Sequence, residues 1–365
     1  MSHPAAPAPA NSDDRHAWAD SGPEDLGGGV HRIPLPLPMA ALKAVNVYAI
    51  LDADGAARVD LIDAGMPFTQ AREQLAAALA KLGCELGDIR NFFVTHAHRD
   101  HYTLAVELRR SRHGTISLGA GEQANLVAAR ALAEGDGVGA FAGQLVRMGA
   151  QELAAKLAAG GGERPGAAEW EDPDHWIEDG TELEVGGRKL RAIHTPGHTR
   201  GHLVFHDASG QTLFAGDHIL PHITPTIGFE PAGNRLALRD YMDSLRLVLR
   251  LPDARLLPAH GPVRDSAHRR VHELLAHHEE RLAEIRAAML PGRSTAYEVA
   301  QAIRWTRRQL SYADLELVSQ LLAAGETAAH LEVLVIRGEL TRHTGVDGTD
   351  HYEVATAAAT RSAPA

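Results

Sequence analysis

The stretch that decides the fold is Thr95-His96-Ala97-His98-Arg99-Asp100-His101. It places three histidines and one aspartate within six positions, and imidazole nitrogens and carboxylate oxygens are ligands that suit zinc and its first-row neighbours. Histidine makes up 22 of 365 residues, so chance would give this pattern on the order of once in 10⁵ positions. The stretch therefore predicts a divalent metal site rather than a histidine-rich solvated loop.

Composition sets the limits within which this site must be built. A chain of 365 residues with 44% hydrophobic content allows two domains, or one large domain with an appendage, around a sizeable core. Cys84 is the only cysteine, so no intrachain disulfide forms and the metal ligands must be histidines and carboxylates. We expect residues 1–28 to be a disordered leader, because they lack the basic start and apolar stretch of a secretory signal. A cytoplasmic protein without a membrane span is expected, since no apolar run approaches about 20 residues.

Alternating strands and helices surround the histidine stretch. Strands are predicted over 45–51, 59–62, 92–94, 183–185, 189–193, 203–206, 212–215 and 255–257. Helices are predicted over 70–82, 120–134 and 141–158. A further helix is predicted because Leu238, Met242, Leu245 and Leu249 would share one apolar helical face. The stretch itself is expected on a loop at the carboxyl end of the 92–94 strand, where α/β sheets commonly place their sites. This order predicts an α/β (α+β) fold of sheets with helices packed outside.

The C-terminal part has a different pattern. A long polar helix within 264–292 is expected to connect it to the rest of the chain, and Thr295 with Glu298 forms a capping-box signature before the next helix. Two more helices, over 315–324 and 327–337, precede a hairpin of 340–343 and 351–354. Three helices followed by a hairpin are typical of a winged helix, here 293–354, and 355–365 is expected to be a disordered tail. His277 and His278 of the connecting helix are expected on a solvated or interdomain face.

Charge argues against a nucleic-acid partner. The whole chain has a formal net charge of −11, which disfavours binding to a phosphate backbone. Within 293–354, six arginines against nine acids leave a net charge of −3, and residues 304–308 form the only basic knot. Winged helices that bind nucleic acid present a basic face. We therefore expect this domain to be structural, to shape the substrate site or to form a homodimer contact, and we expect a small-molecule substrate.

Three further ligand candidates lie downstream of the histidine stretch. His198, Asp217 and His260 each come directly after a predicted strand and are flanked by small or turn-forming residues. Such neighbours let the backbone bring a ligand close. Because each candidate follows a strand, all seven ligands are expected to meet at one edge of the fold.

At these residues, and at the preceding Asp63-Ala64-Gly65, the chain resembles the metallo-β-lactamase superfamily over residues 29–263. The resemblance implies an αββα sandwich with a metal centre at one edge. The C-terminal winged helix narrows it to the branch that carries such a domain, which includes bacterial hydrolases and an animal endoribonuclease-like member. The resemblance implies one metal held by His96, His98 and His198, a second held by Asp100, His101 and His260, and Asp217 bridging both. Zinc is the first choice, with iron or manganese as alternatives.

The chemistry that the resemblance implies is hydrolysis. Two cations about 3.5–4 Å apart share a hydroxide at neutral pH, which attacks an electrophilic carbon or phosphorus, while a cation stabilises the developing oxyanion. Asp100 and Asp217 are the predicted catalytic residues, with Asp100 orienting the hydroxide. The expected substrate is a small ester, thioester or lactone.

Three other functions stay open. The His-Arg-Asp-His wording and the winged helix also fit a metal-dependent endoribonuclease. An iron-dependent sulfur oxidoreductase on the same fold is another alternative, although diiron oxygen reducers usually have glutamate where His98 stands. A non-enzymatic regulator with a relic metal fold is the last, and the complete ligand set argues against it.

Overall fold

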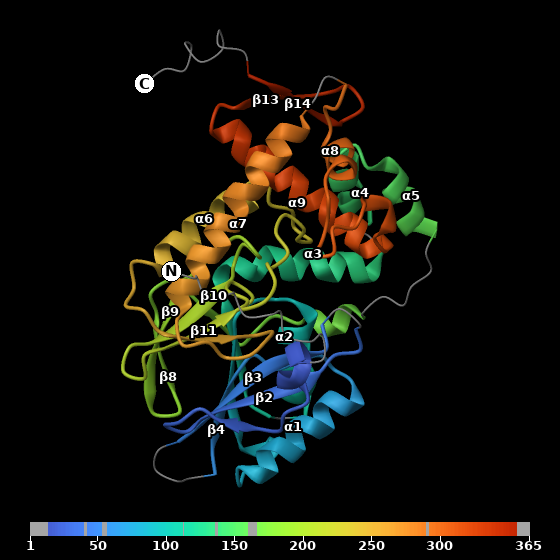
Figure 1. Ribbon diagram of the computed structural model, residues 1–365. Coiled ribbons are helices and arrows are strands. Elements are labelled where there is room, and N and C mark those ends of the chain that lie inside the picture. The colour runs from blue at the N-terminus through green and yellow to red at the C-terminus, as the bar shows by residue number, and fades with distance from the viewer. Residues whose placement is uncertain are drawn as a thin grey trace, which may run out of the picture.

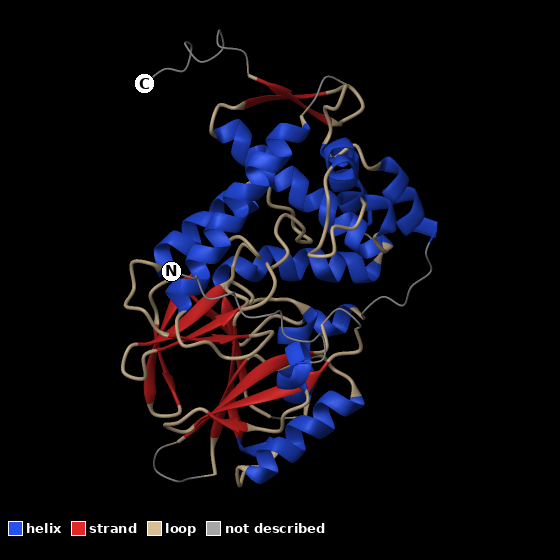
Figure 2. Cartoon of the chain, in the orientation of Figure 1, coloured by secondary structure: helices blue, strands red, loops and turns tan. Residues whose placement is uncertain are grey.

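Two β-sheets lie face to face between layers of helices (Figures 1 and 2). The structure is a computed structural model that describes residues 14–39, 42–52, 57–111, 113–135, 138–159, 166–289 and 292–355. The C-terminal helices and hairpin lie beyond one edge of the two sheets (Figure 1). No helix in the described ranges combines the length and apolarity that crossing a bilayer requires.

The first sheet has seven strands in sequence order. It is antiparallel from β1 to β4 and parallel from β4 to β7. Its strands are β1 (Glu24–Asp25), β2 (Val30–Pro36), β3 (Ala44–Leu51), β4 (Val59–Ile62), β5 (Ile89–Val94), β6 (Thr115–Gly119) and β7 (His175–Ile177). Parallel neighbours need a crossover connection, and α1 (Thr69–Lys81) and α2 (Arg99–Arg110) supply the first two. The segment between β6 and β7 carries α3 (Gln123–Glu134), α4 (Val138–Arg147) and α5 (Gln151–Ala159).

The second sheet has five strands in the order β12-β11-β10-β9-β8. Its strands are β8 (Glu182–Val185), β9 (Arg188–His194), β10 (Leu203–Asp207), β11 (Thr212–Gly216) and β12 (Arg255–Pro258). The predicted hairpins β8–β9 and β10–β11 are confirmed, and α6 (Ala237–Val248) connects the parallel pair β11 and β12. Short 3-10 turns complete the structure: η1 (Asp14–Ala19), η2 (Leu86–Asp88), η3 (Ala120–Glu122), η4 (Ala167–Trp170) and η5 (Tyr312–Asp314).

Three hydrophobic clusters hold the layers together. One lies between the sheets, where the rings of Tyr48 and Phe214 meet edge to face at 5.3 Å. A second joins α1 and α2 to the outer face of the first sheet, and a third joins α6 to the outer face of the second. Full burial of an apolar side chain such as Phe205 stabilises the fold by about 1.5–3 kcal/mol. Hydrophobic packing therefore joins all the layers of the sandwich.

The C-terminal elements pack directly onto the second sheet's helical layer. They are α7 (Ala267–Ala288), α8 (Ala296–Ala302), α9 (Leu317–Ile336) and the hairpin β13 (Leu340–Thr344) with β14 (Asp350–Val354). Val271, Leu274 and Ile285 of α7 belong to the same cluster as α6, so α7 packs on the sandwich and joins it to the C-terminal elements. The capping box of Thr295 and Glu298 begins α8 as predicted.

The helices predicted over 315–324 and 327–337 are one continuous helix, α9. The break was expected at Gly325-Glu326. Gly325 instead marks a close packing contact, because a Cβ on it would lie 3.2 Å from the Gly228 carbonyl oxygen and 3.3 Å from the Phe229 ring. The glycine therefore serves the contact between α9 and the loop after β11 rather than ending a helix.

Other expectations also need correction. Residues 14–28, assigned to a disordered leader, contain η1 and β1, because the buried guanidinium of Arg32 hydrogen-bonds to the Trp18 carbonyl, Ser21 and Glu24. The helix expected over 141–158 is divided into α4 and α5 at Gly149, whose φ is 76°. Strands β2, β6 and β7 were not predicted. Residues 1–13 of the leader, residues 53–56 between the strands predicted over 45–51 and 59–62, and residues 356–365 of the tail lie outside the described ranges.

Candidate metal centre

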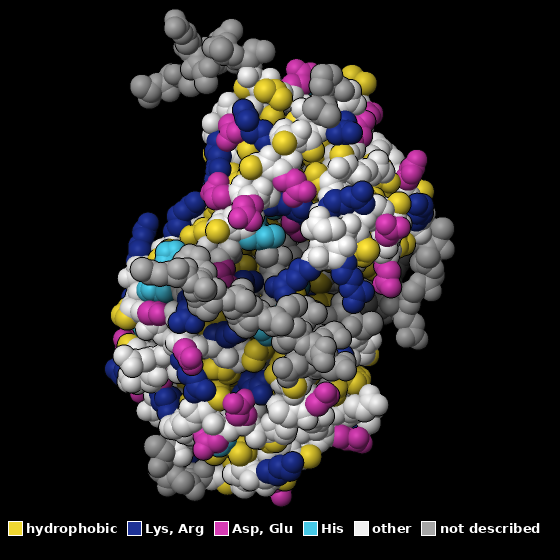
Figure 3. Space-filling model, viewed as in Figure 1, with side chains coloured by type: hydrophobic (Ala, Val, Ile, Leu, Met, Phe, Trp, Pro, Cys, Tyr) yellow, Lys and Arg dark blue, Asp and Glu magenta, His cyan; other side chains and the backbone are white. Residues whose placement is uncertain are grey.

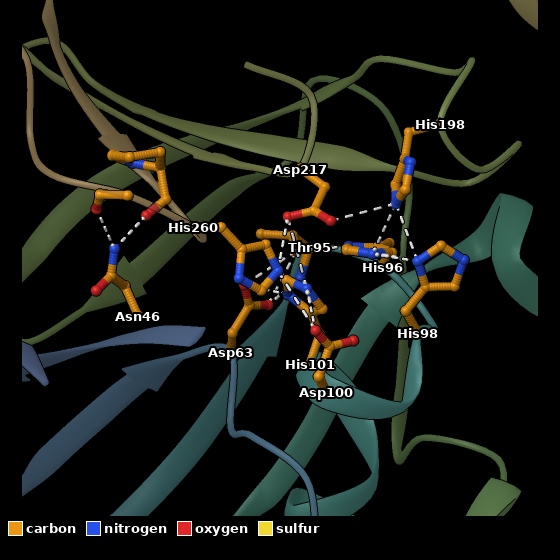
Figure 4. Close-up of polar contacts among 12 residues, drawn as sticks. Asn46, Asp63, Thr95, His96, His98, Asp100, His101, His198, Asp217 and His260 are labelled. Atoms are coloured by element: carbon orange, nitrogen blue, oxygen red, sulfur yellow. Dashed lines mark hydrogen bonds and ion pairs between the residues drawn. The ribbon is translucent and has the colours of Figure 1, made fainter. Parts of the chain in front are cut away.

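The seven predicted ligands converge at the carboxyl ends of strands from both sheets (Figure 4). His96 and His98 follow β5, and His198, Asp217 and His260 follow β9, β11 and β12. Asp100 and His101 were expected on a loop, but they lie in the first turn of α2. There the His98 carbonyl accepts the His101 and Tyr102 N–H groups at 3.1 and 3.0 Å. The helix therefore turns Asp100 and His101 back toward the strand ends.

Three imidazoles of one group point their ring nitrogens at a common position. The Nδ1 atom of His98 lies 2.9 Å from both His96 Nε2 and His198 Nε2, and these two nitrogens are 3.2 Å apart. Burial lowers the pKa of His98 to about 3 and that of His198 to about 4, and it holds the pKa of His96 well below its ordinary value. Neutral imidazoles present lone pairs, so this group suits a cation.

Asp217 lies between the two groups. Its Oδ2 atom is 3.5 Å from His198 Nε2 in the first group. Its Oδ1 atom is 3.6 Å from His101 Nε2 and 3.4 Å from His260 Nε2 in the second group. Each carboxylate oxygen thus faces a different set of imidazoles.

The second group contains Asp100, His101 and His260. Three buried polar atoms face this group and have no hydrogen-bond partner among the described residues: His101 Nε2, His260 Nε2 and the neighbouring Asp217 Oδ1. Buried polar atoms are nearly always satisfied, so such orphans need a partner that the chain does not supply. Two imidazoles, once both are neutral, and the carboxylates of Asp100 and Asp217 form a donor set that fits a divalent cation.

Hydrogen bonds behind the imidazoles fix their orientation. His198 Nδ1 lies 2.8 Å from the Thr226 carbonyl oxygen, and His260 Nδ1 lies 2.8 Å from the Ala44 carbonyl oxygen. A carbonyl accepts only from an N–H, so both rings carry the proton on Nδ1 and present Nε2 to the centre. Such outer partners commonly set the tautomer of a metal-binding histidine.

Asp63 contacts residues of both groups through its carboxylate, directly or through Thr95. Its carboxylate accepts the Thr95 N–H at 2.8 Å and the Thr95 hydroxyl at 3.0 Å, and it lies 2.9 Å from His101 Nδ1. Thr95 Oγ1 in turn lies 3.0 Å from His96 Nδ1. Asp63 has a φ of 61°, a left-handed conformation that aspartate tolerates better than most residues. A single side chain therefore orients one imidazole directly and a second one through Thr95.

Charge around the second group differs from that around the first. Burial lowers the pKa of His101, but the carboxylates of Asp100, Asp63 and Asp217 outweigh this effect and raise the pKa to about 10. Burial is likewise outweighed at His260, whose pKa is raised by Asp217 and Asp100. The metal-free centre thus holds a protonated His101 beside its carboxylates. The His101 ion pairs stabilise the metal-free fold fully below pH 6.5, and this contribution is lost as pH rises through about 10.

Metal binding to the second group is expected to release protons at pH 8, because a cation must displace the proton from His101. Binding to the first group should release almost none, since its imidazoles are already neutral. Calorimetric titration of metal-free protein in two buffers of different ionisation enthalpy measures the difference. Equal heats in both buffers for the second group would contradict the expectation.

The sequence did not single out a set of residues that hold the His198 loop. The Glu122 carboxylate accepts the Gly201 N–H at 3.1 Å and the Thr199 hydroxyl, and Glu230 accepts the Arg200 N–H at 3.0 Å. Burial raises the pKa of Glu122 to about 7. Isolated glutamates on predicted helices or loops carry no local signal for such a role, so the tertiary contacts alone reveal it.

His202 was also missed. It is fully buried, stacks on His96 with ring centroids 4.9 Å apart, and accepts the Asp217 N–H on Nε2 at 3.2 Å. It therefore contacts a predicted ligand on each side. The available signal was its position four residues after His198 in Gly-His-Thr-Arg-Gly-His.

Three residues of the histidine stretch, of the position after it and of the connecting helix form contacts between elements rather than with the metal centre. Arg99 forms a bidentate ion pair with Glu169 at 2.7 and 3.0 Å, and the Tyr102 hydroxyl donates to the Glu171 carbonyl at 2.6 Å. Both bonds hold α2 against the η4 segment. His278 is buried on α7, 3.2 Å from a ring nitrogen of His330 on α9, which confirms the interdomain alternative for this residue.

Comparisons with known proteins agree with this architecture. The Metallo-beta-lactamase superfamily matches residues 41–260, and the family described as Metallo-beta-lactamase-like, C-terminal domain, matches residues 282–355. The chain is similar to Beta-lactamase-like protein 2 homolog of Caenorhabditis elegans, with 39% identity over 111 residues, 30% of this chain and 35% of the relative. It is also similar to Lactamase-like protein nscB of Aspergillus fumigatus, with 36% identity over 117 residues, 32% of this chain and 33% of the relative. These matches span about a third of the length of each curated relative.

A solved structure extends the likeness over nearly the whole chain. The metallo-beta-lactamase family protein from Thermus thermophilus is 26% identical, with a TM-score of 0.66. The alignment covers 90% of this chain and 100% of that protein. The C-terminal elements therefore belong to a known arrangement with the sandwich.

Proposed function

Because the chain belongs to the metallo-beta-lactamase superfamily, whose members are mostly hydrolases, we propose that it is a dinuclear metal-dependent hydrolase of a small ester, thioester or lactone. The observation that carries the proposal is the position of Asp217. Its two oxygens face two separate groups of imidazoles, at 3.5 Å on one side and 3.4–3.6 Å on the other. A single cation would need only one of these groups.

The residues divide into two ligand sets. His96, His98 and His198 would hold one cation, Asp100, His101 and His260 would hold the other, and Asp217 would touch both. When bound, two divalent cations supply Lewis acidity and make water a nucleophile at neutral pH. Zinc is the first choice, and iron or manganese are alternatives.

Asp100 and Asp217 are the residues that we assign to catalysis. Asp100 Oδ2 lies 3.3 Å from His260 Nε2, and burial, which raises its pKa, is outweighed by His101 and His260, which lower it below the ordinary value. Asp100 is therefore a carboxylate at neutral pH, able to accept a hydrogen bond from the attacking water. Asp217 keeps the two ligand sets at a fixed separation.

We also propose that α8, α9 and the β13–β14 hairpin form a winged helix that shapes the substrate site. Arg307 of this unit donates to the His222 carbonyl at 2.7 Å, in the loop that follows Asp217. This contact supports a role in building the mouth of the centre. A homodimer contact through the same unit is the alternative role.

Metal analysis followed by a substrate panel tests the proposal. Purified protein should contain about two metal ions per chain and hydrolyse at least one of an acyl thioester, an acyl ester and a lactone. Asp217→Ala should abolish that hydrolysis. Cleavage of single-stranded RNA with no esterase or thioesterase activity would overturn the proposal in favour of an endoribonuclease.

A further inference from the structure

Two arginines from distant parts of the chain meet at the loop beside the metal centre. Arg264 Nη2 lies 3.1 Å from His222 Nδ1, and Arg307 Nη2 donates to the carbonyl of the same residue at 2.7 Å. The His222 ring also borders Gly261, since a Cβ on Gly261 would lie 3.8 Å from His222 Cδ2. Gly261 follows the predicted ligand His260, so His222, which both guanidinium groups contact, lies beside the loop that carries His260.

These arginines differ from others around them in their charge partners. On α7, Arg270 pairs with Glu273 at 2.8 Å and Arg281 pairs with Glu284 at 2.7 Å. Among the described residues, no carboxylate lies within ion-pair distance of four exposed arginines at this place: Arg264, Arg304, Arg307 and Arg308. Lys and Arg side chains gather where the sandwich meets the C-terminal helices (Figure 3).

The guanidinium groups keep most of their hydrogen-bonding capacity. Arginine carries five N–H donors, and the described contacts of Arg264 and Arg307 engage one nitrogen of each side chain. The guanidinium fork matches the geometry of phosphate oxygens. Arg304 directly precedes the turn closed by the bridge between Trp305 and Leu310, and Arg308 lies within it beside Arg307, so the same short segment carries two more exposed cations.

We propose that this arginine rim, formed by Arg264, Arg304, Arg307 and Arg308, binds the phosphate groups of a substrate's carrier portion. The inference rests on the proposed function and deepens it: the substrate is an acyl thioester or ester of a phosphorylated small carrier. Its reacting carbonyl lies at the metal centre, and its phosphates lie on the rim. The C-terminal unit thereby contributes to substrate choice.

The rim is too small for a nucleic acid. Other arginines of the C-terminal unit are neutralised, Arg337 by Glu279 at 2.7 Å and Arg342 by Glu332 at 2.6 Å. Recognition of a nucleic acid needs an extended basic face that neutralises many phosphates. A cluster of four cations on a chain of net charge −11 suits one compact anionic group.

Coenzyme A and pantetheine test the rim, because they share the thiol arm and differ in the phosphates and the nucleotide that carries them. Calorimetry on the metal-loaded protein should give a lower Kd for coenzyme A than for pantetheine, with a difference that shrinks as salt rises. The double variant Arg264→Ala/Arg307→Ala should weaken coenzyme A binding on the order of tenfold to a hundredfold, since charged hydrogen bonds are the strong ones. Arg307→Lys should restore part of the affinity, and inorganic pyrophosphate should compete.

A control variant removes a positive charge elsewhere, for comparison with Arg264→Ala and Arg307→Ala taken singly. Arg72 lies on α1, on the outer face of the first sheet, with a half-exposed side chain, and Arg72→Ala should leave coenzyme A binding as in the parent protein. Equal Kd values for coenzyme A and pantetheine, or no loss in the double variant, would overturn the rim. So would single-stranded RNA that displaces coenzyme A at lower concentration than pyrophosphate does.

The binding readout separates this inference from the proposed function. Phosphate-dependent binding of coenzyme A without hydrolysis of any acyl thioester or ester supports the rim and contradicts the hydrolase. Hydrolysis of acyl-pantetheine and acyl-coenzyme A with the same kcat/KM supports the hydrolase and contradicts the rim. In the double variant, the ratio of these two kcat/KM values should move toward one.

Discussion

Asp217→Asn is expected to lower kcat/KM on the order of 10³-fold or more. The substitution keeps the shape of the side chain but removes its negative charge, and it replaces one oxygen by an amide nitrogen that cannot act as a ligand. One of the two imidazole groups then loses its shared carboxylate. The variant should lose several kcal/mol of the transition-state stabilisation that the metal ions supply. Each 1.36 kcal/mol corresponds to a factor of ten in rate.

Steady-state kinetics and metal content measured on the same sample check this expectation. The variant should bind fewer than two metal ions per chain after dialysis. Asp243→Asn is the control, because Asp243 is an exposed carboxylate on α6 that pairs with Arg246 at 2.9 Å. Full activity in Asp217→Asn would refute the bridging role, as would an equal loss of activity in both variants.

Asp63→Ala is expected to weaken the second metal position by about 10–100-fold, although Asp63 is no ligand. Removal of an outer hydrogen-bond partner of a metal-binding histidine typically has this effect. The same change should lower the free energy of unfolding by about 3–5 kcal/mol, because it breaks a buried pair and leaves His101 without its partner. Alanine also tolerates a φ of 61° poorly, which adds about 1–2 kcal/mol.

Asp63→Asn separates these two effects. Asparagine accepts the left-handed conformation and keeps one oxygen for Thr95, so it should recover much of the lost stability in urea titrations. It should recover less of the metal affinity in chelator competition, because it cannot supply a negative charge to His101. Unchanged affinity in Asp63→Ala would show that His101 is oriented by other contacts.

The site was more predictable from the sequence than the fold around it. All seven predicted ligands lie in the two groups that converge, because strand ends and histidines are both local signals, and their roles as ligands stay a prediction. Strand β6, Thr-Ile-Ser-Leu-Gly, is short and joins the sheet only by pairing with β5 and β7. Strand β2 contains Pro34 and Pro36, which disfavour strands locally, yet it pairs along its whole length with β3. Such elements depend on partners far away in sequence.

Helix α2 illustrates the opposite error. Residues 99–103 look like a polar metal-binding loop, but the helix is stabilised by the burial of Tyr102, Leu104 and Val106 against the first sheet. The residues after His198 were likewise given no role in the sequence analysis. Their anchoring by Glu122 and Glu230 depends on segments 77 and 30 residues away in the chain.

The seam between the sheets has a consequence for folding. The predicted ligands come from β5 and α2 in the first half of the chain and from β9, β11 and β12 in the second. Asn46 already bridges the halves, donating to the Pro258 and Gly261 carbonyls at 2.9 and 2.8 Å (Figure 4). Cations at this seam would bind only when both halves are folded, because each half supplies part of the predicted ligands. The stability of the contact between the two halves would then rise with metal concentration. Removal of the metal by a chelator would separate the halves at this seam before either half unfolds.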